Sequence, residues 1–379
     1  MSLDDDARSE LARLEAEGRL RVPRVVEGLQ GPRVMLDGKL VLNFASNDYL
    51  SLAGDPRLAR AAATALDAAG AGAGASRLIV GNHREHVALE RALEDWLRVT
   101  GVRLFNSGYA ANVGTIAALV GPGDTVISDE LNHASIIDGC RLSRADVVVV
   151  PHRELAGFER ALASRSGKKL VISESLFSMD GDVADVEALA TLARRHDAAL
   201  MLDEAHALGV LGPEGRGVAA SCGVMPDVLV GTHGKALGGF GAFVATTRAI
   251  ADLLWNRARS LVFSTGLPPA VAASVRAAIE IVRGRDGEER RRAIEDNARA
   301  LRRGVPEAGG DASSPIAPLV VGDDRVVMQQ TARLLERGVF VQGIRPPTVP
   351  VGTARLRVSV SSGHSEMDVG ALVDALRHR

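Results

Sequence analysis

The feature that most constrains this chain is a regular alternation between Phe105 and Thr246, where short apolar runs alternate with amphipathic stretches. The apolar runs are Thr125–Ser128, Val147–Val150, Leu170–Ser173, Ala199–Asp203, Val228–Val230 and Ala242–Thr246. The stretches with helical spacing include Ala110–Val120, Ala134–Leu142 and Val186–His196. Strands that alternate with helices form a mainly parallel sheet with helices on both faces. This part of the chain therefore predicts an α/β domain.

The pattern changes on either side of this segment. Helical spacing over residues 4–20 predicts a surface helix ahead of the α/β region. After Ala249 long helical stretches follow, then short strands and helices up to a terminal helix, which predicts a smaller α+β domain. We therefore expect an N-terminal helix and segment over 1–48, a large domain over 49–282 and a small domain over 283–379.

Composition excludes several classes of partner. The net charge of the 379 residues is −2 and aromatic residues make up 3%, so neither a basic field nor stacking side chains favour a nucleic acid. No apolar run reaches the roughly 18 residues of a membrane span. Two cysteines and an acidic N-terminus without an apolar segment favour a reducing compartment, so we expect a cytoplasmic protein.

Asp203 ends an apolar strand and is followed three residues later by His206. Ligands of open α/β sheets bind beyond the carboxyl ends of the strands, where Asp203 should lie. Three interpretations are open from this segment alone. First, Asp-Glu-Ala-His occurs as the Walker B pattern of some helicases. Second, Asp203 could pair with the ring nitrogen of pyridoxal phosphate, which needs a carboxylate there. Third, Asp203 could be a solvated loop carboxylate without a function.

Lys235 decides between these interpretations. Its segment, Gly231-Thr-His-Gly-Lys235-Ala, is too short for a P-loop and lacks the hydroxyl that binds magnesium, so the helicase interpretation fails. A lysine at a strand end among small residues suits a Schiff-base nucleophile, because partial burial leaves more of the amine neutral. Only four of the 45 basic residues are lysines, and Lys39, Lys168 and Lys169 are expected in solvated turns or strand starts.

A phosphate site is also expected. Gly108 and Tyr109 open a helix directly after a strand, and free N–H groups at a helix N-terminus bind phosphate. His133 lies at another such turn. The pair His83 and His86 lacks the spacing of zinc sites and no Cys/His cluster accompanies it, so we expect no metal.

Together these motifs resemble a known family. They are Asn47-Asp-Tyr-Leu, Ser107-Gly-Tyr-Ala-Ala-Asn, His133-Ala-Ser, Phe177-Ser-Met-Asp-Gly-Asp, Asp203-Glu-Ala-His, Thr232-His-Gly-Lys and Ser264-Thr-Gly-Leu-Pro-Pro. In this order and spacing, from about residue 40 to 365, the chain resembles the α-oxoamine synthases. The resemblance implies the PLP-dependent transferase fold (fold type I), with a mostly parallel seven-stranded sheet in the large domain and a smaller α+β C-terminal domain.

The resemblance implies pyridoxal 5'-phosphate (PLP) as cofactor. Lys235 would bind it covalently and later remove the substrate Cα proton, Asp203 would pair with the ring nitrogen, and His133 would stack on the ring. The other cofactor contacts implied are Gly108, Tyr109, Ser178, His206, Thr232 and Thr265. Because Thr265 would reach the phosphate of the partner subunit, a homodimer with shared active sites is implied.

Substrate contacts are implied in the same way, for Arg21, Asn47, His133, Arg345 and Thr348. Segment 344–357 is most like that of family members that condense L-alanine with a pimeloyl thioester in biotin biosynthesis, releasing carbon dioxide and giving 8-amino-7-oxononanoate. Pimeloyl-CoA and a pimeloyl acyl-carrier protein both remain open as the donor.

Two alternatives also stay open. One is a sibling synthase that joins glycine to acetyl-CoA, and the other is a non-catalytic protein that binds the same cofactor. His233 departs from the family, because relatives often place an apolar or aromatic residue at this position. We expect it to pack rather than react.

Overall fold

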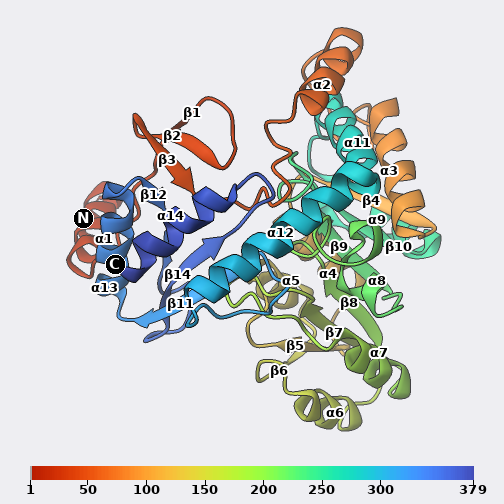
Figure 1. Ribbon diagram of the computed structural model, residues 1–379. Coiled ribbons are helices and arrows are strands. Elements are labelled where there is room, and N and C mark those ends of the chain that lie inside the picture. Colours follow the sequence, from red (N-terminus) through yellow and green to blue (C-terminus); the bar gives the residue numbers. More distant parts are fainter. Residues whose placement is uncertain (1) are drawn as a thin grey trace.

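The computed structural model describes residues 2–379, and its centre is a seven-stranded sheet (Figure 1). The strand order is β4-β10-β9-β8-β7-β5-β6. The strands are β4 (Gly101–Phe105), β5 (Thr125–Asp129), β6 (Asp146–Val150), β7 (Lys169–Glu174), β8 (Ala199–Asp203), β9 (Val228–Thr232) and β10 (Ala242–Thr246). Only β10 runs antiparallel to its neighbours, so the predicted mostly parallel seven-stranded sheet is confirmed.

Helices cover both faces of this sheet, as its apolar strands require. They are α3 (Arg84–Leu97), α4 (Gly108–Leu119), α5 (Ala134–Ser143), α6 (Leu155–Ala163), α7 (Val186–Arg195), α8 (Gly217–Ser221), α9 (Arg248–Arg257), α10 (Arg259–Val262) and α11 (Pro269–Arg283). Successive strand residues point to opposite faces. Accordingly, Val126 of β5 packs in the core beneath α4 and α5, and the next residue, Ile127, packs beneath α6 and α7.

Two further sheets are formed near the ends of the chain, and one of them contains strands from both ends. One has the order β1-β2-β3-β12 and the other β11-β14-β13. The strands are β1 (Val26–Glu27), β2 (Arg33–Leu36), β3 (Lys39–Asn43), β11 (Ile316–Gly322), β12 (Val339–Phe340), β13 (Gln342–Ile344) and β14 (Ala354–Ser359). The helices are α1 (Leu3–Ala16), α2 (Pro56–Ala69), α12 (Arg285–Gly304), α13 (Asp324–Glu336) and α14 (Glu366–Arg377). Residues 26–43 thus pair with the C-terminal part of the chain through β3 and β12.

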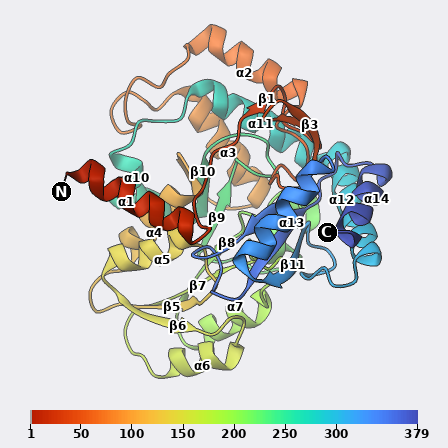
Figure 2. The same cartoon turned by 90° about the vertical axis from the view of Figure 1, so that its left-hand side faces the viewer.

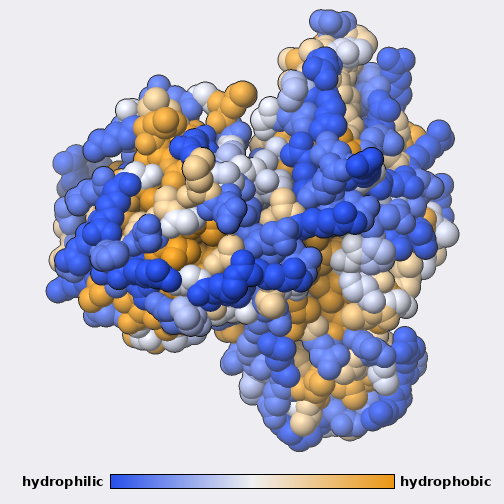
Figure 3. All heavy atoms as spheres, in the orientation of Figure 1, coloured by the Kyte–Doolittle hydropathy of each residue, from blue (hydrophilic) through white to orange (hydrophobic). Residues whose placement is uncertain are grey.

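Helix α12 runs between the central sheet and the C-terminal sheets, and its outer surface is mostly hydrophilic in Figure 3. Exposed ion pairs four residues apart line it, such as Arg285 with Glu289 and Arg292 with Glu288. Its inner face is apolar, since Ile294, Ala298 and Leu301 are fully buried. Among residues 2–379, no helix combines the length and apolarity of a membrane span.

The loop over residues 177–183 connects the central sheet to the C-terminal sheet. The carbonyl of Ser178 accepts a hydrogen bond from Nε of Arg357 at 2.6 Å, and Asp180 forms an ion pair with Arg355. Both arginines lie on β14. The position of this loop therefore depends on both parts of the molecule.

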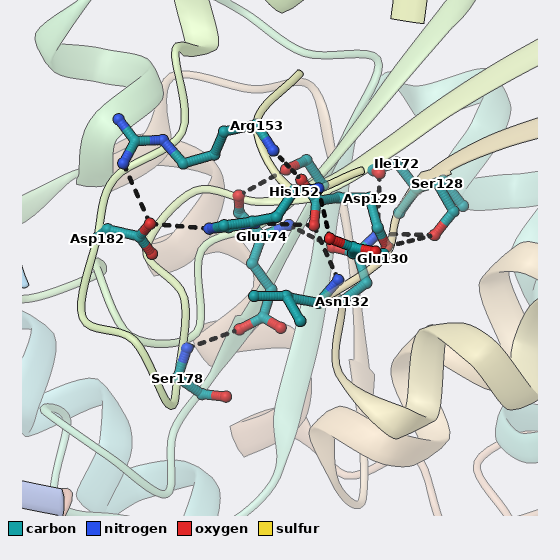
Figure 4. A network of polar contacts seen from close by, with 12 residues as sticks. Ser128, Asp129, Glu130, Asn132, His152, Arg153, Ile172, Glu174, Ser178 and Asp182 are labelled. Carbon is teal, nitrogen blue, oxygen red and sulfur yellow. Dashed lines mark hydrogen bonds and ion pairs between the residues drawn. The ribbon is translucent and has the colours of Figure 1, made fainter. Parts of the chain in front are cut away.

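A histidine holds the same loop from the other side (Figure 4). Nδ1 of His152 lies 3.0 Å from Asp129 at the end of β5, and Nε2 lies 2.8 Å from Asp182 in the loop. Arg153 also pairs with Asp182, at 3.1 Å. Burial alone would lower the pKa of His152, but the hydrogen bonds and charges of the two carboxylates outweigh it and raise the pKa to about 10. His152 is therefore a cation that joins two loops.

A second histidine, His233, packs in the core without any polar partner. It is fully buried and stacks on Phe243 of β10, with ring centroids 5.3 Å apart. Neither ring nitrogen has a hydrogen-bond partner among the described residues. Burial lowers the pKa of His233 to about 4, so the ring is neutral at pH 7. This geometry agrees with the expected packing role.

We predict that His152→Gln destabilises the protein by about 2 kcal/mol near pH 6.5, because two carboxylates lose their cation. The folded pKa of about 10 lies above the ordinary value of 6.5. The stabilisation is therefore fully present below pH 6.5 and is lost as the pH rises toward 10. Urea unfolding of both proteins between pH 6.5 and 10 measures this. A stability difference that does not shrink with pH would contradict the prediction.

We predict that His233→Phe raises the melting temperature, because it removes two unpaired buried nitrogens and keeps the stacked ring. The gain should be about 1 kcal/mol. His364 offers a matched control, since it is also buried and stacks on Phe44, but both its nitrogens are hydrogen-bonded, to Ser361 and Asn43. His364→Phe should lower the melting temperature. Equal effects of the two substitutions in thermal unfolding would show that unpaired nitrogens are not the cause.

Candidate active site

Three neighbouring strands place the ionisable groups of the site at their carboxyl ends. Glu174 ends β7 and is in register with Asp203, which ends β8. The next strand, β9, ends at Thr232, and the loop after it carries Lys235. This loop packs closely on Leu52 and Ala53, because a Cβ on Gly238 would lie 2.5 Å from their backbone atoms. The glycines near Lys235 thus let its loop approach the neighbouring backbone.

Lys235 is held by a hydrogen-bonded histidine. Its Nζ lies 2.8 Å from Nε2 of His206, and Nδ1 of His206 lies 2.7 Å from the hydroxyl of Tyr49. That hydroxyl also lies 3.2 Å from Oδ1 of Asn47. The structure therefore brings the expected residues Asn47, His206 and Lys235 together, with Tyr49 between them.

Burial controls the charges of this group. It lowers the pKa of Lys235 to about 8, against the opposing attraction of Asp203 and Glu174. It also lowers the pKa of His206 well below its ordinary value, with Lys235 and Arg357 adding to the effect. At pH 7, His206 is therefore uncharged and about a tenth of Lys235 is the free amine, which is the nucleophilic form.

Two hydrogen bonds orient the carboxyl group of Asp203. Its Oδ2 accepts a hydrogen bond from Asn112 at 2.7 Å, and its Oδ1 accepts one from the backbone N–H of Ala205 at 2.9 Å. Glu174 is buried beside it, and burial together with the charge of Asp203 raises the pKa of Glu174. Among the described residues, Oε1 of Glu174 has no hydrogen-bond partner, and Oε2 accepts from the N–H of Ser178 at 3.2 Å.

These groups fit PLP. A buried carboxylate suits the ring nitrogen, and the Lys235 amine suits the aldehyde carbon. The N-terminus of α4 begins at Gly108, where a Cβ would meet nothing within 4 Å, so the space above the Gly108 and Tyr109 amides is open for a phosphate. Thr232 lies at the end of β9, and its hydroxyl accepts from the N–H of Gly234.

A cavity of about 1160 Å³ opens beside this group. His133 and Ser178 line it near the strand ends, and Arg21 and Thr348 line it as well. Helix α1 forms part of its wall and crosses the molecule in front of α4 and α5 in Figure 2. Four expected residues from distant segments thus share one cavity.

Two expected residues lie elsewhere. The guanidinium of Arg345 donates to the carbonyls of Gly18 and Leu20, the latter at 2.8 Å, and so holds the segment after α1. Thr265 pairs with Ser76 in an isolated bridge, and its carbonyl accepts from Asn106 at 2.8 Å.

Four polar groups of the site were not predicted from the sequence. Tyr49, Asn112 and Arg357 lie within motifs that were recognised, but their roles depend on contacts between distant segments. Glu174 carried a usable signal, because it ends an apolar strand as Asp203 does. The expectation that Lys169 is solvated was wrong, since it lies buried at the start of β7.

Comparisons with known proteins agree with this geometry. The family described as aminotransferase class I and II matches residues 39–376. The curated 8-amino-7-oxononanoate synthase of Geobacter sulfurreducens is 48% identical over 374 residues, covering 97% of this chain and 96% of that protein.

Solved structures show the same likeness. The serine palmitoyltransferase of S. paucimobilis, with PLP and myriocin bound, has a TM-score of 0.93 and 30% identity, covering 99% of this chain and 96% of that one. The 8-amino-7-oxononanoate synthase of Francisella tularensis has a TM-score of 0.76 and 27% identity, covering 89% of this chain and 98% of that one. The chain belongs to the class I and II aminotransferase family, and within it to the 8-amino-7-oxononanoate synthases.

Proposed function

We propose that the protein condenses L-alanine with a pimeloyl thioester, releasing carbon dioxide and the free thiol carrier and giving 8-amino-7-oxononanoate for biotin. It is a PLP-dependent acyltransferase. The observation that carries this reaction class is the Lys235 amine near the buried carboxylate of Asp203. The choice of substrates rests on the 48% identity to an 8-amino-7-oxononanoate synthase over nearly the whole chain.

Each of the site's residues has a separate role in this reaction. Bound PLP supplies an electron sink for the carbanion at the amino-acid Cα. Lys235 accepts the proton from this carbon, which requires the free amine that its lowered pKa provides. Asp203, held by Asn112, keeps a proton on the ring nitrogen. His133 lines the cavity from the N-terminus of α5 and would cover the ring of the bound cofactor.

Cofactor contacts from the remaining residues are part of the same proposal. The amides of Gly108 and Tyr109 and the hydroxyl of Thr232 would bind the phosphate of the cofactor. Ser178 would contact a cofactor oxygen, and His206 would contact the oxygen on the ring. These positions are supported by the open N-terminus of α4 and by the hydrogen bonds that orient Ser178 and His206.

The cavity supports a long acyl substrate. Its wall carries apolar side chains from α1, α5 and the loop before β14, namely Leu11, Leu14, Ile137, Val349 and Val351. Arg21 and Thr348 also line it and are our candidates for the acyl contacts. We assign the amino-acid carboxylate to Asn47 and to Arg345, which would have to leave the carbonyls of Gly18 and Leu20. An acetyl group would fill little of this cavity, so the glycine and acetyl-CoA alternative is not favoured.

We also propose a homodimer with shared sites. Segment 78–80 is apolar and exposed, and so is Phe263, which is 72% exposed. Ser76 and Thr265 pair between these two segments. A second copy of the chain would cover this apolar surface and place Thr265 near its partner's phosphate. Both cysteines are free thiols, which supports a reducing compartment such as the cytoplasm.

The first test compares two substrate pairs with the cofactor-loaded protein. L-alanine with pimeloyl-CoA should release free thiol, and glycine with acetyl-CoA should release at least about tenfold less, because the longer acyl chain buries more apolar surface in the cavity. A thiol-reactive dye measures the release. Preference for the glycine pair would reject the proposed substrates and leave the reaction class standing.

Lys235→Ala should lower turnover by about 10³-fold or more, because the proton acceptor is lost. Lys39→Ala is the matched control, since Lys39 begins β3 on the surface, and it should keep wild-type turnover. Circular dichroism of both variants reports the fold. Wild-type-like turnover by Lys235→Ala would reject the assigned chemistry.

A further inference from the structure

A single hydroxyl proton, that of Tyr49, lies between the residues that bind substrate and the catalytic lysine. Tyr49 is fully buried in the segment between β3 and α2. Its oxygen has three polar neighbours, each from a different part of the site: Nη2 of Arg357 at 3.3 Å, Nδ1 of His206 at 2.7 Å and Oδ1 of Asn47 at 3.2 Å. A phenol donates one hydrogen bond, so the acceptor of this proton determines the directions of the other hydrogen bonds around Tyr49.

Two of the three contacts limit the choices. Arginine can only donate, so Arg357 occupies one lone pair of the Tyr49 oxygen. The proton of Tyr49 can then go to His206 or to Asn47. The contact to His206 measures 2.7 Å, which is typical of a hydroxyl donor, whereas an N–H donor usually lies at about 2.9–3.0 Å and the contact to Asn47 is longer, at 3.2 Å. The distances therefore favour donation from Tyr49 to Nδ1 of His206.

Donation to Nδ1 determines where His206 carries its own proton. His206 is buried next to the cationic groups Lys235 and Arg357, with His133 also nearby, so it is neutral and has one ring proton. When Nδ1 accepts, this proton is on Nε2. Nε2 lies 2.8 Å from Nζ of Lys235 and can donate only to a free amine, because an ammonium group has no acceptor.

We propose that Tyr49 is a positioning residue that fixes His206 as the Nε2-protonated tautomer, so that His206 presents a hydrogen-bond donor to the Lys235 amine and to the ring oxygen of the cofactor. The tautomer itself follows from the chain's own contacts, and its use in catalysis rests on the proposed function.

The opposite arrangement has the opposite consequence. If Tyr49 donated to Asn47, Nδ1 of His206 would donate to Tyr49, and the lone pair of Nε2 would accept from a Lys235 ammonium group. The proposed arrangement thus favours the free amine of Lys235, and the opposite one favours its charged form. The other charged groups facing Lys235 are Asp203, Glu174 and Arg357, and they are the same in both arrangements.

Nitrogen-15 NMR of the histidine-labelled full chain, freed of cofactor, tests the tautomer directly. The chain has nine histidines, and the spectrum of His206→Gln identifies the signals of His206 by their loss. We expect His206 to show a protonated Nε2 and an unprotonated Nδ1 at pH 9, where most of Lys235 is the free amine because its pKa is about 8. A protonated Nδ1, or a charged ring, would overturn the proposal.

The second test measures the pKa of Lys235 from the pH dependence of its reaction with an amine-selective reagent, followed by mass spectrometry. With only four lysines the sites are easily separated, and exposed Lys39 serves as the internal reference. Tyr49→Phe removes the donor to Nδ1 and keeps the buried ring. We expect the pKa of Lys235 to rise by about one unit, the equivalent of one hydrogen bond.

The other outcomes of this substitution are distinguishable. The opposite arrangement predicts a fall, because the Nδ1 proton would lose its acceptor, and a purely structural role predicts no shift; both would overturn the proposal. Should Tyr49→Phe fail to fold, Asn47→Ala decides: the pKa stays at the wild-type value if Tyr49 donates to His206, and falls if it donates to Asn47. Neither readout uses turnover, so a failed substrate assignment would leave both intact.

Discussion

The site depends on the crowding of two carboxylates and one amine at the ends of adjacent parallel strands. Glu174 and Asp203 are in register, so both cannot be ionised without strong repulsion in a buried place. Asn112 and Ala205 donate hydrogen bonds to Asp203, while burial and the charge of Asp203 raise the pKa of Glu174, so that Glu174 takes a proton more readily. The same burial leaves the amine of Lys235 partly neutral. One constraint of sheet geometry thus separates the charge states that PLP chemistry requires.

Contacts outside the site hold the loop over residues 177–183, which lies beside these groups. His152 ties the loop over 177–183 to the end of β5, and Arg357 ties it to the C-terminal sheet. Arg357 also reaches Tyr49, which contacts His206. The C-terminal sheet is therefore linked to Lys235 through Arg357, Tyr49 and His206 in turn.

Much of this could be predicted from the sequence, because the signals are local. The strand ending at Asp203 and the glycines around Lys235 indicate a site at the strand ends, and the motifs indicate the family. What could not be predicted depends on distant contacts. Nothing local to Tyr49 indicates that it meets His206 and Arg357, and nothing near Arg345 indicates that it binds the carbonyls of Gly18 and Leu20. The small sheet of β1, β2, β3 and β12 was not predicted, because it pairs residues 26–43 with a strand that lies about 300 residues further along the chain.

The pairing of β3 with β12 has a consequence for how the chain matures. Leu42 is opposite Val339, so the strand that leads into Asn47 and Tyr49 gains this neighbour only after roughly 300 further residues have been made. On the ribosome the central sheet and Lys235 are complete much earlier, since domains fold as the chain emerges. The strand end that leads to Lys235 is therefore made long before the partner of the strand that leads to Tyr49. The site as described is complete only once β12 and Arg357 of β14 have also been made.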